Sequence, residues 1–189
     1  MSKMDPGRKG IVESVKDKMV GSIKGTGEVM NAAVDTVSGT LVTTIKGTGA
    51  VGTALTSTVS DVLRGAIMGT SQVGGDVGAA AKGGVVGVLK GTKEVGVETV
   101  DTVSVSARTL VKSAAEVGGD LGAVARNTVE GAISGAKQVG LNVEEAASAA
   151  ATGAIKGAGE VSQEAVRQVR GAVTGFIAGV KVVVKEPFK

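Results

Sequence analysis

A 22-residue repeat runs through almost the whole of this 189-residue chain and constrains its fold more than any other feature. Each copy starts with Ile, Leu or Val. The eight starts are Ile23, Ile45, Ile67, Leu89, Val111, Ile133, Ile155 and Ile177, with no insertion or deletion between them. Internal repeats are the signature of repetitive architectures, so the repeat takes precedence over any short motif.

The repeat length is typical of an amphipathic α-helix. Twenty-two residues are two blocks of 11, and 11 residues complete three turns at about 3.67 residues per turn, close to the natural 3.6. Apolar positions therefore stay on one side of the helix from copy to copy, while charged positions take the other side. A β-strand would need strict alternation at every second residue, which the repeats do not show.

The apolar side of this helix forms a continuous stripe that we predict to face a lipid surface or a partner. Its members are Ile23, Val29, Val37, Leu41, Ile45, Val51, Leu55, Val59, Leu63, Ile67, Val73, Val77, Val85, Leu89, Val95, Val103, Val111, Val117, Leu121, Val129, Ile133, Val139, Val143, Ile155, Val161, Val169, Val173, Ile177 and Val183.

The predicted fold is all-α, with one long amphipathic helix, or a few long helices, and no globular core. A polar, flexible N-terminus is expected over residues 1–10, the repeat region over 11–186 and a C-terminal tail over 187–189. Hairpins that fold the rod back on itself are the alternative, at the glycine pairs Gly74–Gly75, Gly83–Gly84 and Gly118–Gly119.

The glycine content makes such a helix weak on its own. Gly occupies 31 positions, and each Gly inside a helix costs about 1 kcal/mol relative to Ala. Aromatic residues, which carry much of the burial in ordinary cores, are limited to Phe176 and Phe188. Something must therefore cover the apolar stripe: a lipid surface, other copies of the chain, or the chain's own folded-back halves.

A lipid surface is the first expectation, because an in-plane helix needs an apolar face, a charged face and moderate overall hydrophobicity. Repeated weak contacts would add through avidity. Basic side chains would reach lipid head groups, anionic ones included. The predicted head-group contacts are Lys24, Lys46, Arg64, Lys82, Lys90, Arg108, Lys112, Arg126, Lys156 and Arg170.

Self-assembly into multi-helix filaments or sheets is the alternative expectation, with a homo-oligomer or polymer as the product. Gly recurs two residues after seven of the eight repeat starts, and Ser113 is the exception. Small residues at a fixed phase let helix backbones approach closely. The predicted close-packing positions are Gly25, Gly47, Gly69, Gly91, Gly135, Gly157 and Gly179.

Two stretches carry a resemblance to known families. The sequences "LKGTKEVGVETVDTVS" at 89–104 and "IKGTGEVMNAAVDTVSGTLVTTIKGTG" at 23–49 resemble the 11-residue repeats of perilipins and, more loosely, the KTKEGV repeats of synucleins. The resemblance covers about residues 11–184 as pattern and composition. It implies a chain that is disordered in solution and becomes helical on lipid droplets or membranes. Because the strict 22-residue period departs from those families, a bacterial membrane or a storage granule is an equal alternative.

Catalysis is not expected. The chain has no His and no Cys, so the commonest general base and the thiol nucleophile are missing. The string "GTGAVG" at 47–52 matches a dinucleotide-binding fingerprint but is one phase of the repeat. We expect no cofactor, metal, small-molecule substrate or nucleic-acid partner. The expected location is cytoplasmic, peripheral on a membrane or on a lipid or storage body.

Overall fold

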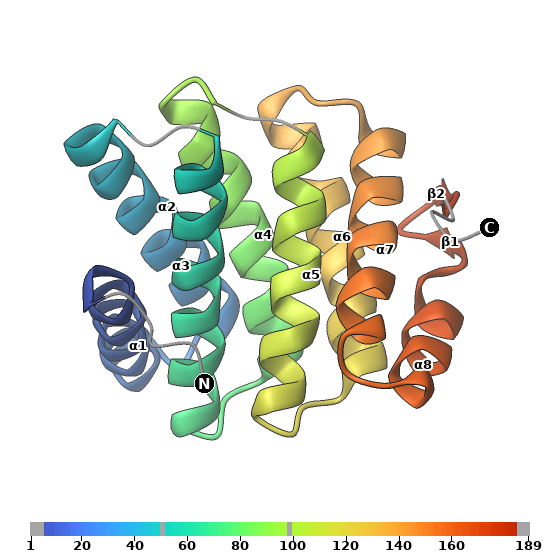
Figure 1. Ribbon diagram of the computed structural model, residues 1–189, viewed down its shortest axis with the longest axis horizontal. Coiled ribbons are helices and arrows are strands. Elements are labelled where there is room, and N and C mark those ends of the chain that lie inside the picture. The colour runs from blue at the N-terminus through green and yellow to red at the C-terminus, as the bar shows by residue number, and fades with distance from the viewer. Residues whose placement is uncertain (1–5, 50–51, 98–99, 185–189) are drawn as a thin grey trace.

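The computed structural model describes residues 6–49, 52–97 and 100–184. Within them the chain forms eight helices and one antiparallel hairpin (Figure 1). The elements are α1 (Pro6–Thr26), α2 (Val29–Thr48), α3 (Thr53–Gln72), α4 (Val77–Glu94), α5 (Val100–Glu116), α6 (Leu121–Val139), α7 (Val143–Gly159), α8 (Gln163–Val173), β1 (Gly175–Ile177) and β2 (Val180–Val182).

The helices are arranged in two layers, with each repeat contributing about one helix. Contacts connect α1, α3, α5 and α7 in one layer and α2, α4, α6 and α8 in the other, while consecutive helices pack between the layers. Figure 1 shows consecutive helices running in opposite directions, so two repeats form one helical hairpin of 44 residues. Stacked hairpins of this kind are the organisation of α-solenoids.

The prediction of long helices without a globular core is therefore wrong, although the all-α class is right for most of the chain. The cause is a short sequence between repeats that ends one helix and caps the next. Gly118 adopts a left-handed φ of 75°, and the amide of Gly119 donates to the carbonyl of Ala114 at 2.8 Å, which terminates α5. The side chain of Asp120 then accepts a hydrogen bond from the amide of Ala123 at 3.0 Å and caps α6.

The expected hairpin sites are correct at two of the three glycine pairs. Gly74 has a φ of 68°, and the turn at 74–75 repeats the geometry of the turn at 118–119. Gly83 and Gly84 instead lie inside α4, where they contact neighbouring helices. The expected domain bounds also shift: α1 already begins at Pro6, whereas residues 1–5 and 187–189 are outside the described ranges.

The last helix, α8, ends at Val173. The prediction that the helical repeat region extends to residue 186 is therefore wrong. Ile177 and Gly179 belong to the hairpin, where Gly179 turns the chain with a φ of 80°. The hairpin packs on α7, and the hydroxyl of Ser148 donates to the carbonyl of Val183. β1 and β2 therefore cover the side of α7 that points away from α5 (Figure 1).

The apolar stripe is the interior of the molecule, because antiparallel neighbours turn their apolar sides toward one another. Of the predicted stripe residues that the structure describes, all belong to the core or pack against it except Val161, which is 43% exposed, and Val183, which is 58% exposed. Val51 lies outside the described residues. The folded-back chain, the third way to cover the stripe, is the one observed.

Glycines bring the helices of one layer into close contact. A Cβ added at Gly65 of α3 would lie 2.6 Å from the carbonyl oxygen of Val12 on α1, well inside van der Waals distance. Gly131 faces Lys82 in the same way, from α6 to α4, at 2.6 Å. These rows of glycines allow a compact interior with small side chains, since each missing Cβ lets two backbones approach.

The predicted close-packing glycines that lie in helices divide into two groups. Gly69, Gly91, Gly135 and Gly157 lie at helix contacts inside the chain. Gly25 and Gly47, on α1 and α2, would have nothing within 4 Å of an added Cβ. The difference arises because each phased Gly faces the helix two places earlier, and no described helix lies two places before α1 or α2.

Candidate binding groove between α3 and α5

The contact between α3 and α5 lacks the glycines that close four other same-layer contacts, namely those of α1 with α3, α2 with α4, α4 with α6 and α5 with α7. Thr109 and Ser113 of α5 stand where α3, 44 residues earlier, has Gly65 and Gly69. Helix α7, 44 residues later, again has glycines at both positions. Side chains on α5 therefore separate it from α3, and these two helices contact each other less extensively than α1 and α3 or α5 and α7 do.

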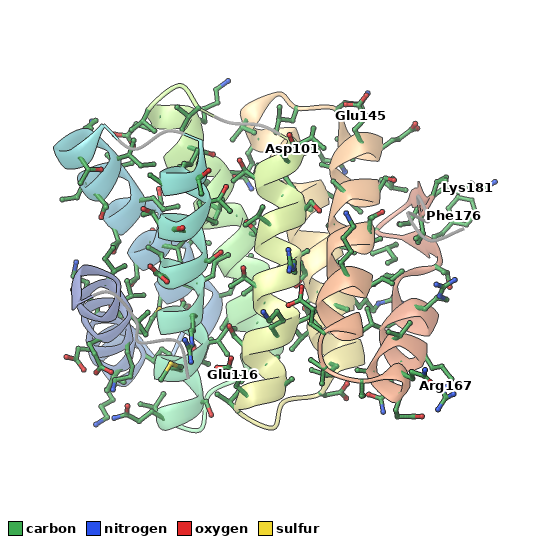
Figure 2. All side chains as sticks on the ribbon, in the orientation of Figure 1. Asp101, Glu116, Glu145, Arg167, Phe176 and Lys181 are labelled. Carbon is green, nitrogen blue, oxygen red and sulfur yellow. The ribbon has the colours of Figure 1, made fainter. Side chains whose placement is uncertain are left out.

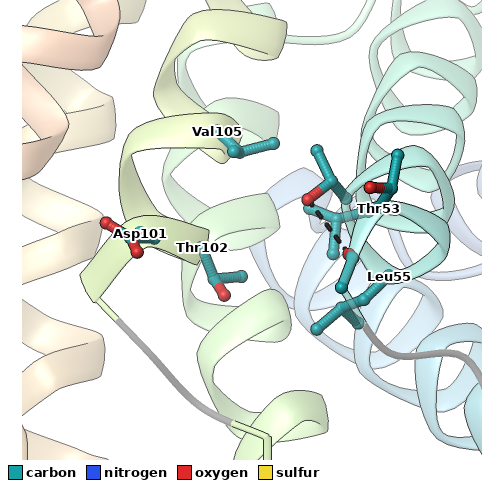
Figure 3. Close-up of a pocket in the computed structure, with 8 residues that line it drawn as sticks. Thr53, Leu55, Asp101, Thr102 and Val105 are labelled. Carbon is teal, nitrogen blue, oxygen red and sulfur yellow. Dashed lines mark hydrogen bonds between the residues drawn. The ribbon is translucent and has the colours of Figure 1, made fainter.

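The separation opens a groove at the N-terminal ends of α3 and α5. Its volume there is about 510 Å³, and Figure 3 shows side chains from the two helices on either side of it. Leu55, Val59 and Val105 make its apolar surface, and the rest of the lining is polar or glycine. The complete lining is Gly52, Thr53, Leu55, Thr56, Val59, Asp101, Thr102 and Val105.

The groove continues toward the C-terminal ends of the same helices, where about 280 Å³ is lined mainly by polar and charged side chains. Thr56 and Val105 line both parts, so the two parts form one feature, which we call the α3–α5 groove. The further lining is Ser60, Asp61, Arg64, Arg108, Thr109, Lys112, Ser113 and Glu116. Figure 2 shows Asp101 and Glu116 near opposite ends of α5, which mark the ends of the groove.

Two polar contacts join the walls of the groove. The hydroxyls of Ser60 and Thr109 are 3.1 Å apart, and the guanidinium of Arg64 lies 3.1 Å from the carboxylate of Glu116. The first contact uses the hydroxyl of Thr109, the residue that takes the place of a glycine in α5. Hydroxyl pairing and a half-exposed ion pair are weak, about 1 kcal/mol each. They hold α3 and α5 at this spacing without sealing the groove.

The basic side chains at the C-terminal end of the groove form ion pairs with Glu160, the residue that follows α7. Arg108 and Lys112 both form ion pairs with Glu160, and Lys112 does so at 2.6 Å. The hydrogen bond from Lys112, with a further one from Arg108, lowers the pKa of Glu160 below its usual value, although partial burial opposes the shift. Glu160 is thus ionised at neutral pH and neutralises part of this cationic cluster.

Most predicted head-group cations pair with carboxylates in the same layer. A spacing of 48 residues, two repeats plus one helical turn, joins Lys46 to Glu94, Lys82 to Glu130 and Lys112 to Glu160. A spacing of 52 joins Arg64 to Glu116 and Arg108 to Glu160. Arg126 lies 3.5 Å from Glu130 on its own helix. No ion pair with a described residue involves Lys24, Lys90 or Lys156, and Arg170 lines a pocket beside α7.

The groove has the chemistry of a binding surface. Its hydroxyls can donate and accept hydrogen bonds, its three aliphatic side chains can bury an apolar group, and Asp101 places a carboxylate at its N-terminal end. Among the described residues, no three carboxylates gather to hold a metal ion. The one sequence signal of the groove is Ser113, which takes the place of the phased glycine. It predicts a groove only once α5 is known to contact α3.

None of the described helices is both long enough and apolar enough to cross a membrane. A comparison with models of known protein families gives no match, and a search of curated proteins gives none either. Any functional conclusion therefore depends on the chain's own repeat, fold and groove.

Proposed function

We propose that this chain is a non-catalytic helical repeat scaffold that binds an extended segment of a partner protein in the α3–α5 groove. The observation that supports this proposal is the groove itself, which opens where one layer lacks its phased glycines. Solenoids of stacked helical hairpins present elongated surfaces that suit extended partners.

The lining defines the chemistry of the partner segment. Leu55, Val59 and Val105 provide an apolar site for one bulky aliphatic side chain. The hydroxyl of Thr53 stands beside this site and can bond to the partner's backbone. Asp101 is exposed at the same end and favours a basic neighbour. The expected segment therefore has a large aliphatic residue next to Lys or Arg.

Selection of peptides from a randomised displayed library tests this proposal. We expect the chain to enrich peptides with the aliphatic–basic pair, and we expect Val105→Trp, which fills the groove, to lose their binding. Val42→Trp, at a half-buried valine of α2 outside the groove, is the matched control and should keep it. Equal binding of the selected peptides by both variants would place recognition outside the groove.

Lipid binding is the second candidate function, and one observation at the C-terminal end favours it. Phe176 is 71% exposed and pairs across the hairpin with Lys181, whose side chain is also exposed (Figure 2). An aromatic ring beside a cation is typical of residues at a membrane interface. In the folded chain the stripe itself is in the core, so a coat of the perilipin kind requires the two layers to separate.

Vesicle flotation distinguishes the two forms of lipid binding. If the folded molecule binds through the hairpin, Phe176→Ser should abolish flotation with vesicles of phosphatidylcholine and phosphatidylglycerol. If the layers open, Phe176→Ser should float as the parent does, and amide exchange in α4 should accelerate on vesicles. Absence of flotation for the parent chain would exclude both.

Self-assembly through Gly25 and Gly47, where an added Cβ would have nothing within 4 Å, stays a prediction.

A further inference from the structure

The α1 end of the stack carries one half of a same-layer contact. Inside the stack, Gly69 of α3 faces the backbone of α1, and a Cβ added there would lie 2.6 Å from the carbonyl oxygen of Lys16. Gly25 of α1 stands 44 residues before Gly69, in the same position of the repeat, and a Cβ added there would have nothing within 4 Å. The glycine face of α1 therefore fits a helix backbone that none of the described helices supplies.

Helix α7 carries the other half of such a contact. The carbonyl oxygen of Ser104 on α5 faces Gly153 of α7 in the way that Lys16 faces the glycine of α3. Ser148 of α7 stands 44 residues after Ser104 and 132 residues after Lys16, again in the same position of the repeat. A helix with phased glycines would therefore dock on α7 around Ser148. Among the described helices, none follows α7 in its layer.

The β-hairpin covers this place on α7, at the opposite end of the stack from α1 (Figure 1). Ser148 is 8% exposed, and its hydroxyl donates to the carbonyl of Val183. Ile177 of β1 is fully buried and belongs to the hydrophobic core. Each strand has three residues, and an isolated two-stranded hairpin is marginally stable at best in water. The hairpin is thus held by its contacts with the helices, and loss of those contacts would uncover α7 without removing a helix.

The charges of the two ends are complementary in the register that the stack already uses. Lys156 of α7 is exposed and forms no ion pair with another described residue. A second copy that continued the stack after α7 would place its α1 four hairpins, or 176 residues, further along the repeat. Glu28 of that copy would then stand 48 positions after Lys156. The same spacing of 48 joins the ion pairs Lys46–Glu94, Lys82–Glu130 and Lys112–Glu160.

Glu28 can take this additional partner. It is exposed, and its carboxylate accepts a hydrogen bond from the amide of Asn31 at 2.6 Å. A carboxylate can accept several hydrogen bonds, and Glu160 already binds two basic side chains, those of Arg108 and Lys112.

We propose that the β-hairpin is an autoinhibitory cover, which occupies the place on α7 where α1 of a second copy of this chain docks. With the hairpin in place the chain is a monomer, and its release allows copies to join head to tail. Such an interface is heterologous and does not close on itself, so it leads to a filament. This assembly does not depend on peptide binding in the α3–α5 groove.

Two variants that release the hairpin test the proposal by sedimentation velocity. Ile177→Asp places a carboxylate in a fully buried position, and Gly179→Val puts a branched residue at a φ of 80°, in the turn of the hairpin. Faster amide exchange over residues 175–182 verifies release, and circular dichroism verifies that the helices are kept. We expect the parent to sediment as a monomer and both variants to form larger species whose size increases with concentration.

A second substitution separates docking from general aggregation. Gly25→Leu fills the glycine face of α1 where an added Cβ has nothing within 4 Å, so it leaves the fold of the monomer intact. The double variant Gly25→Leu/Ile177→Asp should therefore stay monomeric alone. It should nevertheless bind the parent in a 1:1 complex, because its α7 is uncovered and the α1 of the parent is open.

A charge reversal tests the register. In the Ile177→Asp background, Lys156→Glu should weaken assembly at least fivefold, and adding Glu28→Lys should restore it. Lys90→Glu is the matched control, because Lys90 is also exposed and forms no ion pair with another described residue, but it lies on α4. Failure of the double reversal to restore assembly would contradict the docked arrangement.

Several outcomes overturn the proposal. These are a parent that already assembles, a released chain with intact helices that stays monomeric, a double variant that assembles alone, and a double variant that does not bind the parent. Loss of the helices in both Ile177→Asp and Gly179→Val would also overturn it, since the hairpin would then be a part of the fold that cannot be released.

Discussion

The close contacts between helices of one layer can be measured with a matched pair of glycine substitutions, Gly21→Ala and Gly65→Ala. The two glycines are 44 residues apart and occupy the same position in α1 and α3. An added Cβ has nothing within 4 Å at Gly21, whereas at Gly65 it would lie 2.6 Å from the carbonyl oxygen of Val12 and 2.8 Å from the Cβ of Val15. Helix propensity is the same in both substitutions, so their difference isolates the contact.

The expected magnitudes follow from these distances. Replacing Gly by Ala inside a helix stabilises it by about 1 kcal/mol, so Gly21→Ala should raise the free energy of unfolding by about that amount. At Gly65 the backbones of α1 and α3 must separate by roughly 0.8 Å to restore an ordinary contact of about 3.4 Å. Overpacking of this kind costs about 1–3 kcal/mol. Gly65→Ala should therefore be less stable than Gly21→Ala by about 1–3 kcal/mol.

Urea unfolding followed by far-ultraviolet circular dichroism measures both variants beside the parent chain. Equal slopes of free energy against urea would show that the difference lies in stability and not in the cooperativity of unfolding. If Gly65→Ala is stabilised as much as Gly21→Ala, then α1 and α3 do not pack through Gly65, and the two-layer arrangement derived from these glycines is refuted.

Three further predictions concern the groove, the ion pairs and the helix caps. Thr109→Gly together with Ser113→Gly should let α5 approach α3 as α7 approaches α5, and should abolish binding of groove-selected peptides while circular dichroism shows the helices intact; retained binding would contradict our account of the groove. The pKa of Glu160 is lowered in the folded chain, so its contribution to stability is present above its ordinary value of 4.5 and is lost as the pH falls through the lower folded value. Glu160→Gln should accordingly be less stable than the parent at neutral pH, and urea unfolding should show this gap shrinking as the pH falls below 4.5, whereas a constant gap would mean that the ion pairs are not its source. Asp120→Ala removes the cap of α6 and should cost about 1 kcal/mol by the same assay, while an unchanged midpoint would show that the cap is dispensable.

The sequence predicts the all-α class, but it predicts neither the division into eight short helices nor how they fold back. The stripe that includes Leu63 and Leu89 keeps its phase because the repeat length is constant at 22 residues. A straight rod and a stack of antiparallel helices need the same periodicity. The turn signal is nevertheless visible, since Gly-Gly-Asp occurs at 74–76 and again at 118–120, and in each case Asp begins the next helix. We predicted hairpins at these pairs only as an alternative.

The candidate site was much harder to predict. Burial of the stripe and coating of a lipid surface both require small apolar side chains, so composition alone does not distinguish them. The groove depends on Thr109 and Ser113 meeting α3, a contact between residues about two repeats apart in the sequence. The same is true of ion pairs such as Lys46 with Glu94, which become evident only when the 44-residue hairpin is recognised as the structural unit.

The two ends of the stack differ in a way that affects how such a chain can lengthen. At one end, the β-hairpin occupies the side of α7 where a further odd-numbered helix would lie, and Ser148 is engaged by it. At the other end, Gly21 of α1 and Gly39 of α2 have nothing within 4 Å of an added Cβ, whereas the equivalent Gly65 of α3 and Gly83 of α4 contact the backbones of α1 and α2. A helical pair duplicated ahead of α1 could therefore pack directly on the glycines of α1 and α2. A pair duplicated after α7 would first have to displace the β-hairpin. Tandem duplication can therefore lengthen this stack more readily at the α1 end than at the α7 end.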